Sequence, residues 1–258
     1  ILETVPECDI NGREYCKSQI HIFDIKRADI KRLGDLKGNK FTIKLNGVRE
    51  INKNTKFLNY FGAQRFGKCK NNHKIGEKIL NREYEEAVEM IMKNSKGYEA
   101  YKSSESENKI KKITTVCDST EKYIFMMKLK GKTDKNIVFG LKREIRMLYL
   151  HAYQSYLYNE SINKEIEKNR QLYESGITND VFEDHEVANV GVDSSLILPL
   201  EKMNDKMLKG GSRKAVAECI ALEGKSYETH FEVSFFLGTS SYATMALREL
   251  LGKNKLNL

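Results

Sequence analysis

Alternating apolar and polar residues predict strands toward both ends of the chain. The alternation runs through residues 18–25, 40–48 and 229–237, and side chains two residues apart in a strand face the same side of a sheet. Asn46 and Gly47 close the second segment, and this dipeptide is typical of tight turns. Both ends of the chain are therefore expected to contribute strands to a sheet.

Apolar residues three or four positions apart predict helices between these strands. This spacing runs through residues 75–94 and from about 141 to 166, so each segment is expected to form an amphipathic helix. A last helix is expected over residues 242–251, with the hydroxyl groups of the preceding GTSS stretch capping its N-terminus. Residues 95–135 are rich in Lys, Ser, Glu and Asn, which predicts a mobile connection, and residues 167–212 are expected to be irregular.

The long helix carries a stripe of apolar and aromatic residues that is predicted to face the core rather than a ligand. The stripe comprises Ile145, Leu148, Tyr149, Ala152, Tyr153 and Tyr156. The order of strand, helix and strand segments predicts an α+β protein, in which a helical insertion interrupts a discontinuous sheet domain.

The composition excludes several classes of protein. The chain has 258 residues, 40% apolar and 31% charged, enough for one large domain or two smaller ones with a core. No run approaches the roughly 18 apolar residues of a membrane span, and the first residues lack the regions of a signal peptide. The protein is expected to be intracellular, in the nucleus, the cytoplasm or both. Because the sequence starts without methionine, we interpret it as beginning partway into a longer chain.

The cysteines and histidines show no metal-binding pattern. The chain has 5 of each, scattered, with no C-x-x-C or H-x-x-x-H pair. Reduced thiols in an intracellular protein explain such cysteines. We therefore expect no metal.

Positive charge is concentrated in one segment. The whole chain carries a net charge of +8, but residues 26–82 hold 16 Lys and Arg against 4 Asp and Glu, a net of +12. Basic charge interleaved with aromatic residues is typical of nucleic-acid-binding proteins. A solvated charged face is the alternative interpretation.

The stretch FLNYFGAQRFG, residues 57–67, lies within this basic segment and combines aromatic side chains with amides and an arginine. A hydrophobic core needs neither the amides nor the arginine, whereas a site that stacks a flat, polar ligand uses all three kinds of group. Together with the basic charge, this stretch predicts a nucleic-acid site.

Motifs of common nucleotide-binding folds are absent, since neither G-x-x-x-x-G-K-[ST] nor G-x-G-x-x-G occurs. LKGGSRK, residues 208–214, is interpreted as a glycine turn, with a phosphate-binding nest that includes Arg213 and Lys214 as the alternative. Asp134, in the stretch GKTDKN, is expected to lie in a solvated loop.

Four stretches occur in an order that resembles one enzyme family. They are LGDLKGNKFTI at residues 33–43, NYFGAQRFG at 59–67, HAYQSYLYN at 151–159 and SFFLGTSSYATMALREL at 234–250. In them the chain resembles the TruD family of tRNA pseudouridine synthases, and in wording its eukaryotic-type branch.

The resemblance implies a fold and a reaction. It implies a pseudouridine-synthase domain with a mixed or antiparallel sheet, formed by residues 1–82 and 213–258, and a mainly helical TRUD domain inserted over residues 83–212. The family's reaction breaks the N1–C1′ bond of a target uridine, turns the uracil and rejoins it through C5, without cofactor or metal. The implied partner is tRNA, with mRNA or other RNA as alternatives. The protein is expected to be a monomer that does not bind membranes.

The resemblance also implies roles for individual residues. Phe61 matches the family's stacking aromatic for a uridine flipped out of its helix, and Asn59 matches an active-site amide. Phe235 matches a second pocket aromatic. Gln64 and Arg65 belong to the same signature as Phe61 and are expected to hold the loop or bind a phosphate. Four further cations are expected to contact RNA or hold loops: Lys37, Lys40, Lys68 and Arg213.

The catalytic aspartate of the family has no counterpart in the sequence. In the family it lies in a G-x-K-D-x-x-A-x-T-x-Q stretch ahead of the aromatic loop, and no Lys-Asp dipeptide occurs in this chain. Asp9 and Asp24 precede the loop without the flanking motif, and Asp134 follows the loop in the wrong order. We interpret the chain as part of an enzyme whose aspartate segment lies outside it. A non-catalytic RNA-binding protein is the main alternative, and a structural protein whose basic surface meets acidic proteins is another.

Overall fold

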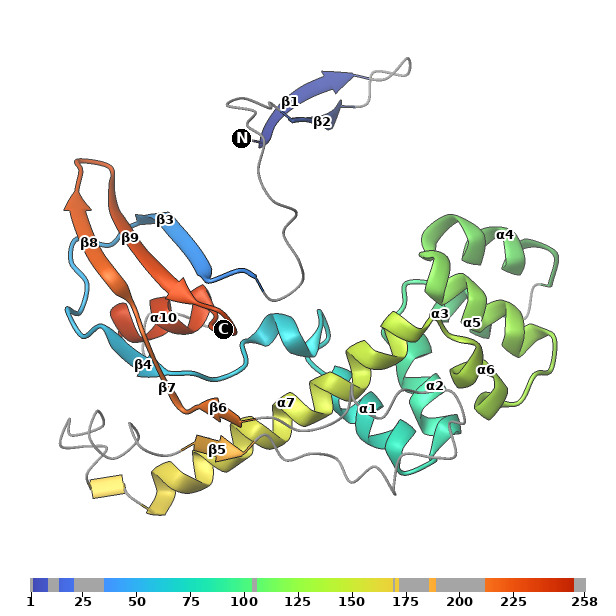
Figure 1. Ribbon diagram of the computed structural model, residues 1–258. Coiled ribbons are helices and arrows are strands. Elements are labelled where there is room, and N and C mark those ends of the chain that lie inside the picture. Colours follow the sequence, from blue (N-terminus) through green and yellow to red (C-terminus); the bar gives the residue numbers. More distant parts are fainter. Residues whose placement is uncertain are drawn as a thin grey trace. The chain divides into compact units, whose positions relative to one another are not determined.

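The computed structural model describes residues 2–8, 14–20, 35–103, 106–168, 170–171, 186–188 and 212–252 (Figure 1). The chain forms two compact units, Ile1–Lys37 and Gly38–Leu258. In the first unit, β1 (Leu2–Cys8) and β2 (Glu14–Ile20) form an antiparallel hairpin. The strand predicted over residues 18–25 overlaps the last three residues of β2, and its remainder lies outside the described residues.

The second unit contains a three-stranded antiparallel sheet with the strand order β3–β9–β8. β3 spans Gly38–Asn46, β8 spans Ile220–Ser226 and β9 spans His230–Gly238. The strands predicted over residues 40–48 and 229–237 are therefore confirmed. Because β3 and β9 come from opposite ends of this unit's sequence, the sheet is discontinuous, as predicted.

Two further strand pairs bring the aromatic loop close to distant parts of the sequence. β4 (Lys56–Leu58) pairs with β7 (Val216–Glu218), and β5 (Glu186–Ala188) pairs with β6 (Ser212–Lys214). The loop that begins at Asn59 follows β4 directly. It therefore lies beside the chain that connects β6 to β7.

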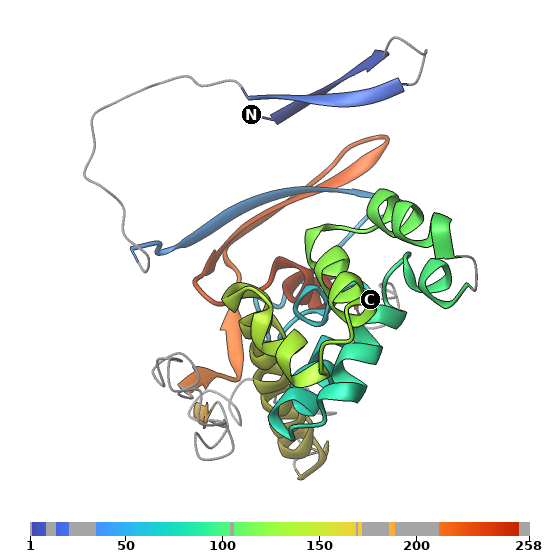
Figure 2. The ribbon, with the colours of Figure 1, turned by 90° about the vertical axis from the view of Figure 1, so that its right-hand side faces the viewer.

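One face of the three-stranded sheet is covered by α10 (Ala243–Leu250), as Figure 2 shows in a view that sees the sheet nearly edge-on. The strand β9 alternates between buried and partly buried residues, and its buried side chains pack against α10. This core comprises Phe231, Val233, Phe235 and Leu237 with Met245, Ala246 and Leu250. The last helix is thus confirmed, but its predicted hydroxyl cap is wrong, because Tyr242 is the N-cap and no side chain caps the helix.

The middle of the chain is helical. Its long helix, α7 (Arg143–Lys168), confirms the helix predicted from about residue 141 to 166. The mobile connection predicted over residues 95–135 is wrong, because helices fill that segment and bury Ile113 and Phe125. The other helices of this part are α1 (Asn72–Leu80), α2 (Tyr84–Lys93), α3 (Tyr98–Lys102), α4 (Ser106–Val116), α5 (Ser119–Leu129) and α6 (Asp134–Gly140).

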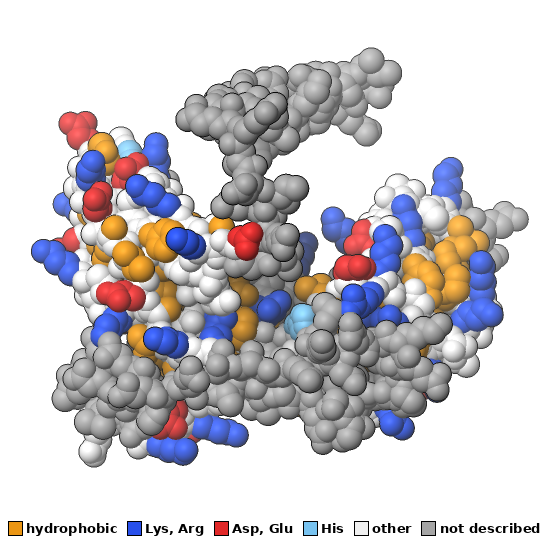
Figure 3. All heavy atoms as spheres, viewed as in Figure 1, with side chains coloured by type: hydrophobic (Ala, Val, Ile, Leu, Met, Phe, Trp, Pro, Cys, Tyr) orange, Lys and Arg blue, Asp and Glu red, His pale blue; other side chains and the backbone are white. Residues whose placement is uncertain are grey.

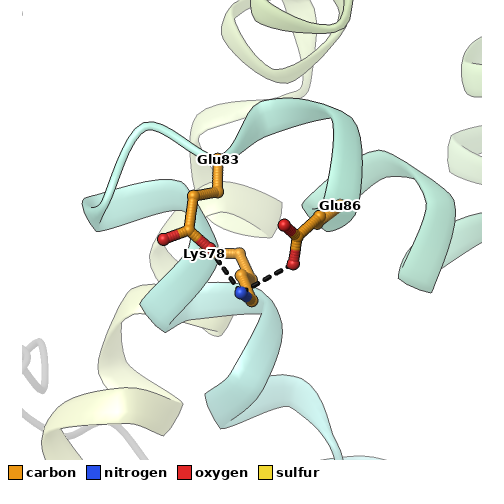
Figure 4. Close-up of polar contacts among 3 residues, drawn as sticks. All are labelled: Lys78, Glu83 and Glu86. Carbon is orange, nitrogen blue, oxygen red and sulfur yellow. Dashed lines mark hydrogen bonds and ion pairs between the residues drawn. The ribbon is translucent and has the colours of Figure 1, made fainter.

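The single helix predicted over residues 75–94 is broken in the structure into α1 and α2. Arg82 lies between them with a φ of 64°, in the left-handed region that ends a helix. Figure 4 shows the Lys78 ammonium of α1 contacting the carboxylates of Glu83 and Glu86 at the start of α2. These contacts raise the pKa of Lys78 and fix the corner through charges that stay on the surface.

The helices α1 and α7 cross at close range because α1 carries a glycine there. A Cβ on Gly76 would lie 2.2 Å from the Tyr149 carbonyl oxygen of α7. The stripe predicted to face the core holds for Tyr149, which is buried, but not for Leu148 and Tyr156, which are 41% and 36% exposed. Among the described residues, no helix is long and apolar enough to cross a membrane.

Candidate active site around Phe61

The loop that follows β4 is held from two sides by hydrogen bonds. On one side, the Asn59 amide N–H donates to the Ala215 carbonyl at 2.7 Å, and Asn59 Nδ2 donates to the Lys214 carbonyl at 3.2 Å. On the other side, the Phe61 N–H donates to Asn159 Oδ1 of α7 at 2.9 Å, and Asn159 Nδ2 returns a bond to the Phe61 carbonyl at 3.0 Å. The loop is therefore fixed in place, with Asn59 only 5% exposed.

An arginine covers the ring of Phe61. The Arg213 guanidinium carbon lies 3.9 Å from the centre of the ring, within the range of a cation–π contact. Arg213 also binds Asn59: its Nη2 donates to the side-chain oxygen at 2.8 Å and to the carbonyl oxygen at 2.9 Å. Burial lowers the pKa of Arg213 from its ordinary value. Three predicted site residues, Asn59, Phe61 and Arg213, thus form one contiguous group.

Two tyrosines complete the surroundings of the Phe61 ring. Tyr158 of α7 meets it edge-on with ring centres 5.4 Å apart, and Tyr242 does so at 6.0 Å. The Tyr158 hydroxyl donates to the Lys214 carbonyl at 2.9 Å, and burial raises the pKa of Tyr158. The ring therefore lies at a boundary, with Arg213 and the tyrosines beside it and the buried apolar residues Ile162 and Ala215 in the same cluster.

Arg65 and Gln64, from the same signature, tie the loop to the helices around it. Arg65 Nε donates to Ser155 Oγ of α7 at 3.1 Å, and the Arg65 guanidinium carbon lies 5.3 Å from the centre of the Phe61 ring. Gln64 Oε1 accepts a bond from Thr244 Oγ1 of α10 at 3.4 Å. Both residues thus make the loop-holding contacts expected from the sequence, and Arg65 also lines the cavity described next.

A cavity of about 790 Å³ opens beside this group. Its lining includes the cations of Arg65, Arg213, Lys56 and Lys214 against the single carboxylate of Glu218. Hydroxyl groups from the loop after β9 also reach it. The full lining is Lys56, Asn59, Phe61, Arg65, Arg213, Lys214, Val216, Ala217, Glu218, Ile220, Gly238, Thr239, Ser240 and Ser241. An anionic, partly aromatic ligand such as a nucleotide matches these walls.

The structure places Phe235 away from this cavity, in contrast to its predicted role as a second pocket aromatic. Its ring is 1% exposed and packs in the core of the sheet, with its centre 5.7 Å from that of Phe41 across the β3–β9 pair. Phe235 is absent from the residues that line the cavity. The alternation that identified β9 as a strand also directs this side chain inward, beneath the sheet.

None of the three lysines predicted to contact RNA or hold loops is among the residues that line the cavity. Lys40 on β3 and Lys68 after the loop are exposed in the second unit, and Lys37 is exposed in the first. Figure 3 shows Lys and Arg side chains over both the sheet part and the helical part of the face in view. Asp and Glu side chains are interspersed with them on both parts.

Sequence reasoning missed four residues that build the site. Ser155, Tyr158 and Asn159 lie in the stretch HAYQSYLYN, which carried the family resemblance but received no roles, and Tyr242 lies in the last stretch. Their side chains contact Phe61 or Arg65. The signal that could have found them is the presence of polar side chains, Ser155 and Asn159, among the tyrosines of this helix.

The aspartates considered from the sequence do not enter this site. Asp134 begins α6, where its carboxylate pairs with Lys128 Nζ at 2.8 Å, so it is a structural residue rather than the solvated loop residue that was expected. Asp9 and Asp24 lie outside the described residues. In the described part of the chain, no group of three His, Cys, Asp or Glu side chains could hold a metal ion.

Comparison with known proteins tests the family resemblance that the sequence suggested. A family model described as tRNA pseudouridine synthase D (TruD) matches residues 5–189, which is more than half of the chain. The chain belongs to the TruD family. The family predicted from the sequence is therefore confirmed, whereas assignment to its eukaryotic-type branch stays a prediction.

Relatives of this TruD chain occur in archaea and in humans. It is 29% identical over 272 residues to a protein of Methanococcus maripaludis named probable tRNA pseudouridine synthase D, covering 90% of this chain and 69% of that protein. It is 26% identical over 313 residues to the human pseudouridylate synthase 7 homolog, covering 85% of this chain and 47% of that protein.

A solved structure supports the fold. The crystal structure of a candidate tRNA pseudouridine synthase D from Methanosarcina mazei matches with a TM-score of 0.57 at 19% identity, over 90% of this chain and 74% of that one. The α+β class predicted from the sequence is confirmed. The predicted domain boundaries, after residues 82 and 212, stay a prediction.

Proposed function

We propose that the protein is a tRNA pseudouridine synthase that isomerises a uridine of the tRNA D-arm, with other RNAs as further substrates. The observation that carries the proposal is the contact of Arg213 with both Phe61 and Asn59 at the wall of a positively charged cavity. A uridine inside a helix exposes neither of its ring faces, so it must be flipped out before its glycosidic bond can react. The cavity offers an aromatic ring for the base and cations for its phosphates.

The side chains of the cavity have separate tasks in this proposal. Phe61 supports the uracil while the N1–C1′ bond breaks, the base turns and the C5–C1′ bond forms. C5 then loses its proton and N1 gains one, so the composition of the nucleotide is unchanged; the family resemblance implies that no cofactor takes part. Asn59 presents its amide at the edge of the base, oriented by Arg213. Arg65 and Lys214 attract the phosphates on either side.

The carboxylate that starts the reaction has no candidate among the cavity residues except Glu218. This side chain accepts a hydrogen bond from Thr55 Oγ1 at 3.2 Å and belongs to the last residue of β7, with no family motif around it. The aspartate that the family resemblance implies belongs to a G-x-K-D stretch, which does not occur in these 258 residues. We therefore expect the 258 residues alone to bind RNA and form no pseudouridine.

Mapping of pseudouridine in unmodified tRNA tests the proposal. The complete gene product is expected to form pseudouridine at a single position, and Phe61→Ala is expected to slow this reaction. Binding of tRNA without product would support the second candidate, a non-catalytic RNA-binding protein. Product from the 258 residues alone would contradict the assignment of the missing carboxylate and direct the search to Asp9, Asp24 and Asp134.

We also propose that the protein acts as a monomer inside the cell, in the nucleus or cytoplasm.

A further inference from the structure

A second cavity, of about 500 Å³, adjoins the first at Phe61, which lines both. The loop, α7 and α10 form its walls. The lining residues are Leu58, Tyr60, Phe61, Gly62, Ala63, Phe66, Tyr156, Asn159, Glu160, Asn163, Ile166, Met245, Arg248 and Glu249. The uridine proposed for the first cavity leaves this second one without an assigned ligand.

One wall of the second cavity is a stacked aromatic pair. The Tyr156 ring lies against the His73 imidazole with ring centres 4.6 Å apart and planes 16° from parallel. Phe66 packs edge-on against the other side of this pair, 5.3 Å from the imidazole centre. His73 covers one face of the tyrosine, and yet Tyr156 remains 36% exposed. Tyr156 also lines the second cavity, so part of its side chain is accessible there.

The pair is electrically neutral under ordinary conditions. Burial lowers the pKa of His73, so the imidazole stays uncharged at neutral pH. A neutral stack that is partly accessible attracts a flat aromatic ligand through contact area and dispersion rather than through charge.

The charges of the two cavities differ in sign. The first is lined by four cations and one carboxylate, whereas the second is lined by the carboxylates of Glu160 and Glu249 and by one guanidinium, that of Arg248. Carboxylates repel phosphate and accept hydrogen bonds, so the second cavity matches a base with amino donors rather than a phosphate group.

We propose that the second cavity binds the base of an unpaired nucleotide that neighbours the target uridine, with Tyr156 as its stacking platform. This inference rests on the proposed function. Because Phe61 lines both cavities, the two bases occupy neighbouring sites. The carboxylates favour adenine, guanine or cytosine, whose amino groups can donate to them, over uracil.

Short RNAs that carry a single 2-aminopurine near the target uridine test this inference. Fluorescence of 2-aminopurine falls when the base stacks, so one labelled position is expected to lose signal on binding. Tyr156→Ala should restore the signal and weaken binding roughly 5- to 100-fold, the range for loss of one base–aromatic stack. Tyr156→Phe, which keeps the ring, should behave like the unchanged protein.

The chain offers a matched control. Tyr227 also stacks on a histidine, His230, at 4.7 Å and 10°, and is 48% exposed, but it lines neither cavity. Tyr227→Ala should change neither binding nor fluorescence.

Two outcomes would overturn the inference, and they bear differently on the proposed function. If Arg213→Ala weakens RNA binding while Tyr156→Ala has no more effect than Tyr227→Ala, the second base does not bind here and the proposed function stands. If the unchanged protein binds none of the RNAs, both fall.

Discussion

Two phenylalanines predicted for the same pocket lie in different surroundings. Phe61 and Phe235 are both nearly buried, at 9% and 1% exposure, so burial alone does not tell them apart. The atoms that cover them do. Phe235 meets apolar side chains between β9 and α10. Phe61 also packs against apolar residues, but a guanidinium lies 3.9 Å from its ring centre and it lines two cavities. A buried aromatic ring belongs to a candidate site when charged groups cover it and a cavity opens beside it.

Replacing each phenylalanine by alanine should separate the two residues by their effect on stability, where we expect the largest difference. Phe235→Ala leaves a void in closely packed core and should lower the free energy of unfolding by about 3 to 5 kcal/mol. Phe61→Ala opens onto a cavity that admits water, so its loss should be smaller. Urea unfolding of both variants measures the difference. Equal losses would show that Phe61 is an ordinary core residue.

Removing the cation over Phe61 should have the next largest effect. Arg213→Ala removes a charge proposed to bind phosphate. It also leaves two buried oxygens of Asn59 without their donor, which should lower the free energy of unfolding by roughly 1 to 3 kcal/mol and loosen the site. RNA affinity should therefore fall on the order of 10- to 100-fold. Arg213→Lys should restore little, because an ammonium lacks the planar fork that binds Asn59. Lys44→Ala, at an exposed position of β3, controls for the loss of one charge. An equal fall in affinity for Lys44→Ala would show that Arg213 contributes only its charge and not its contacts in the site.

Keeping the bulk at Phe61 while changing its chemistry should have a moderate effect on rate. Phe61→Leu removes base stacking of roughly 1 to 3 kcal/mol, and the loss should fall on the chemical step, since many RNA contacts are to phosphates distant from the pocket. Phe61→Tyr should be milder, because the ring remains and only a hydroxyl is added. Single-turnover rates of the complete enzyme measure both. A normal rate for Phe61→Leu with a normal melting temperature would remove Phe61 from the site.

The exposed lysines should contribute the smallest effect per residue. RNA affinity is expected to fall with salt, and replacing Lys37, Lys40 and Lys68 together by alanine should flatten that dependence by up to about 0.7 in slope per lost contact with a single strand. Because none of the three lines the Phe61 cavity, the reaction of bound RNA should be unchanged. Affinity measured across a salt series decides this, and an unaltered slope would place the RNA elsewhere on the surface.

Local patterns predicted those parts of the fold whose residues are close in sequence. The nine residues of β9 alternate strictly, because one face of that strand packs on α10. The helices between residues 95 and 135 were missed because their few buried residues, such as Ile113 and Phe125, lie among many lysines. Their stability comes from packing against one another, which no local pattern records.

The candidate site divides in the same way. Asn59, Phe61 and Arg65 stand within seven residues of one another and could be read together. Arg213 comes 154 residues after Asn59, and only the pairing of β4 with β7 brings it over the Phe61 ring. Tyr158 could not be separated from the tyrosines of the core stripe, because helical spacing gives the face of a side chain and not its partner.

Coupling between the Phe61 ring and the target base tests the central claim most directly. Affinities are measured for the unchanged protein and Phe61→Leu, each with RNA that carries the target uridine and with RNA that lacks only that base. If the ring supports the flipped uracil, the two changes should be non-additive by roughly 1 to 3 kcal/mol, the contribution of one base–aromatic stack. Additive changes would contradict the claim, because they would mean that Phe61 does not touch the base.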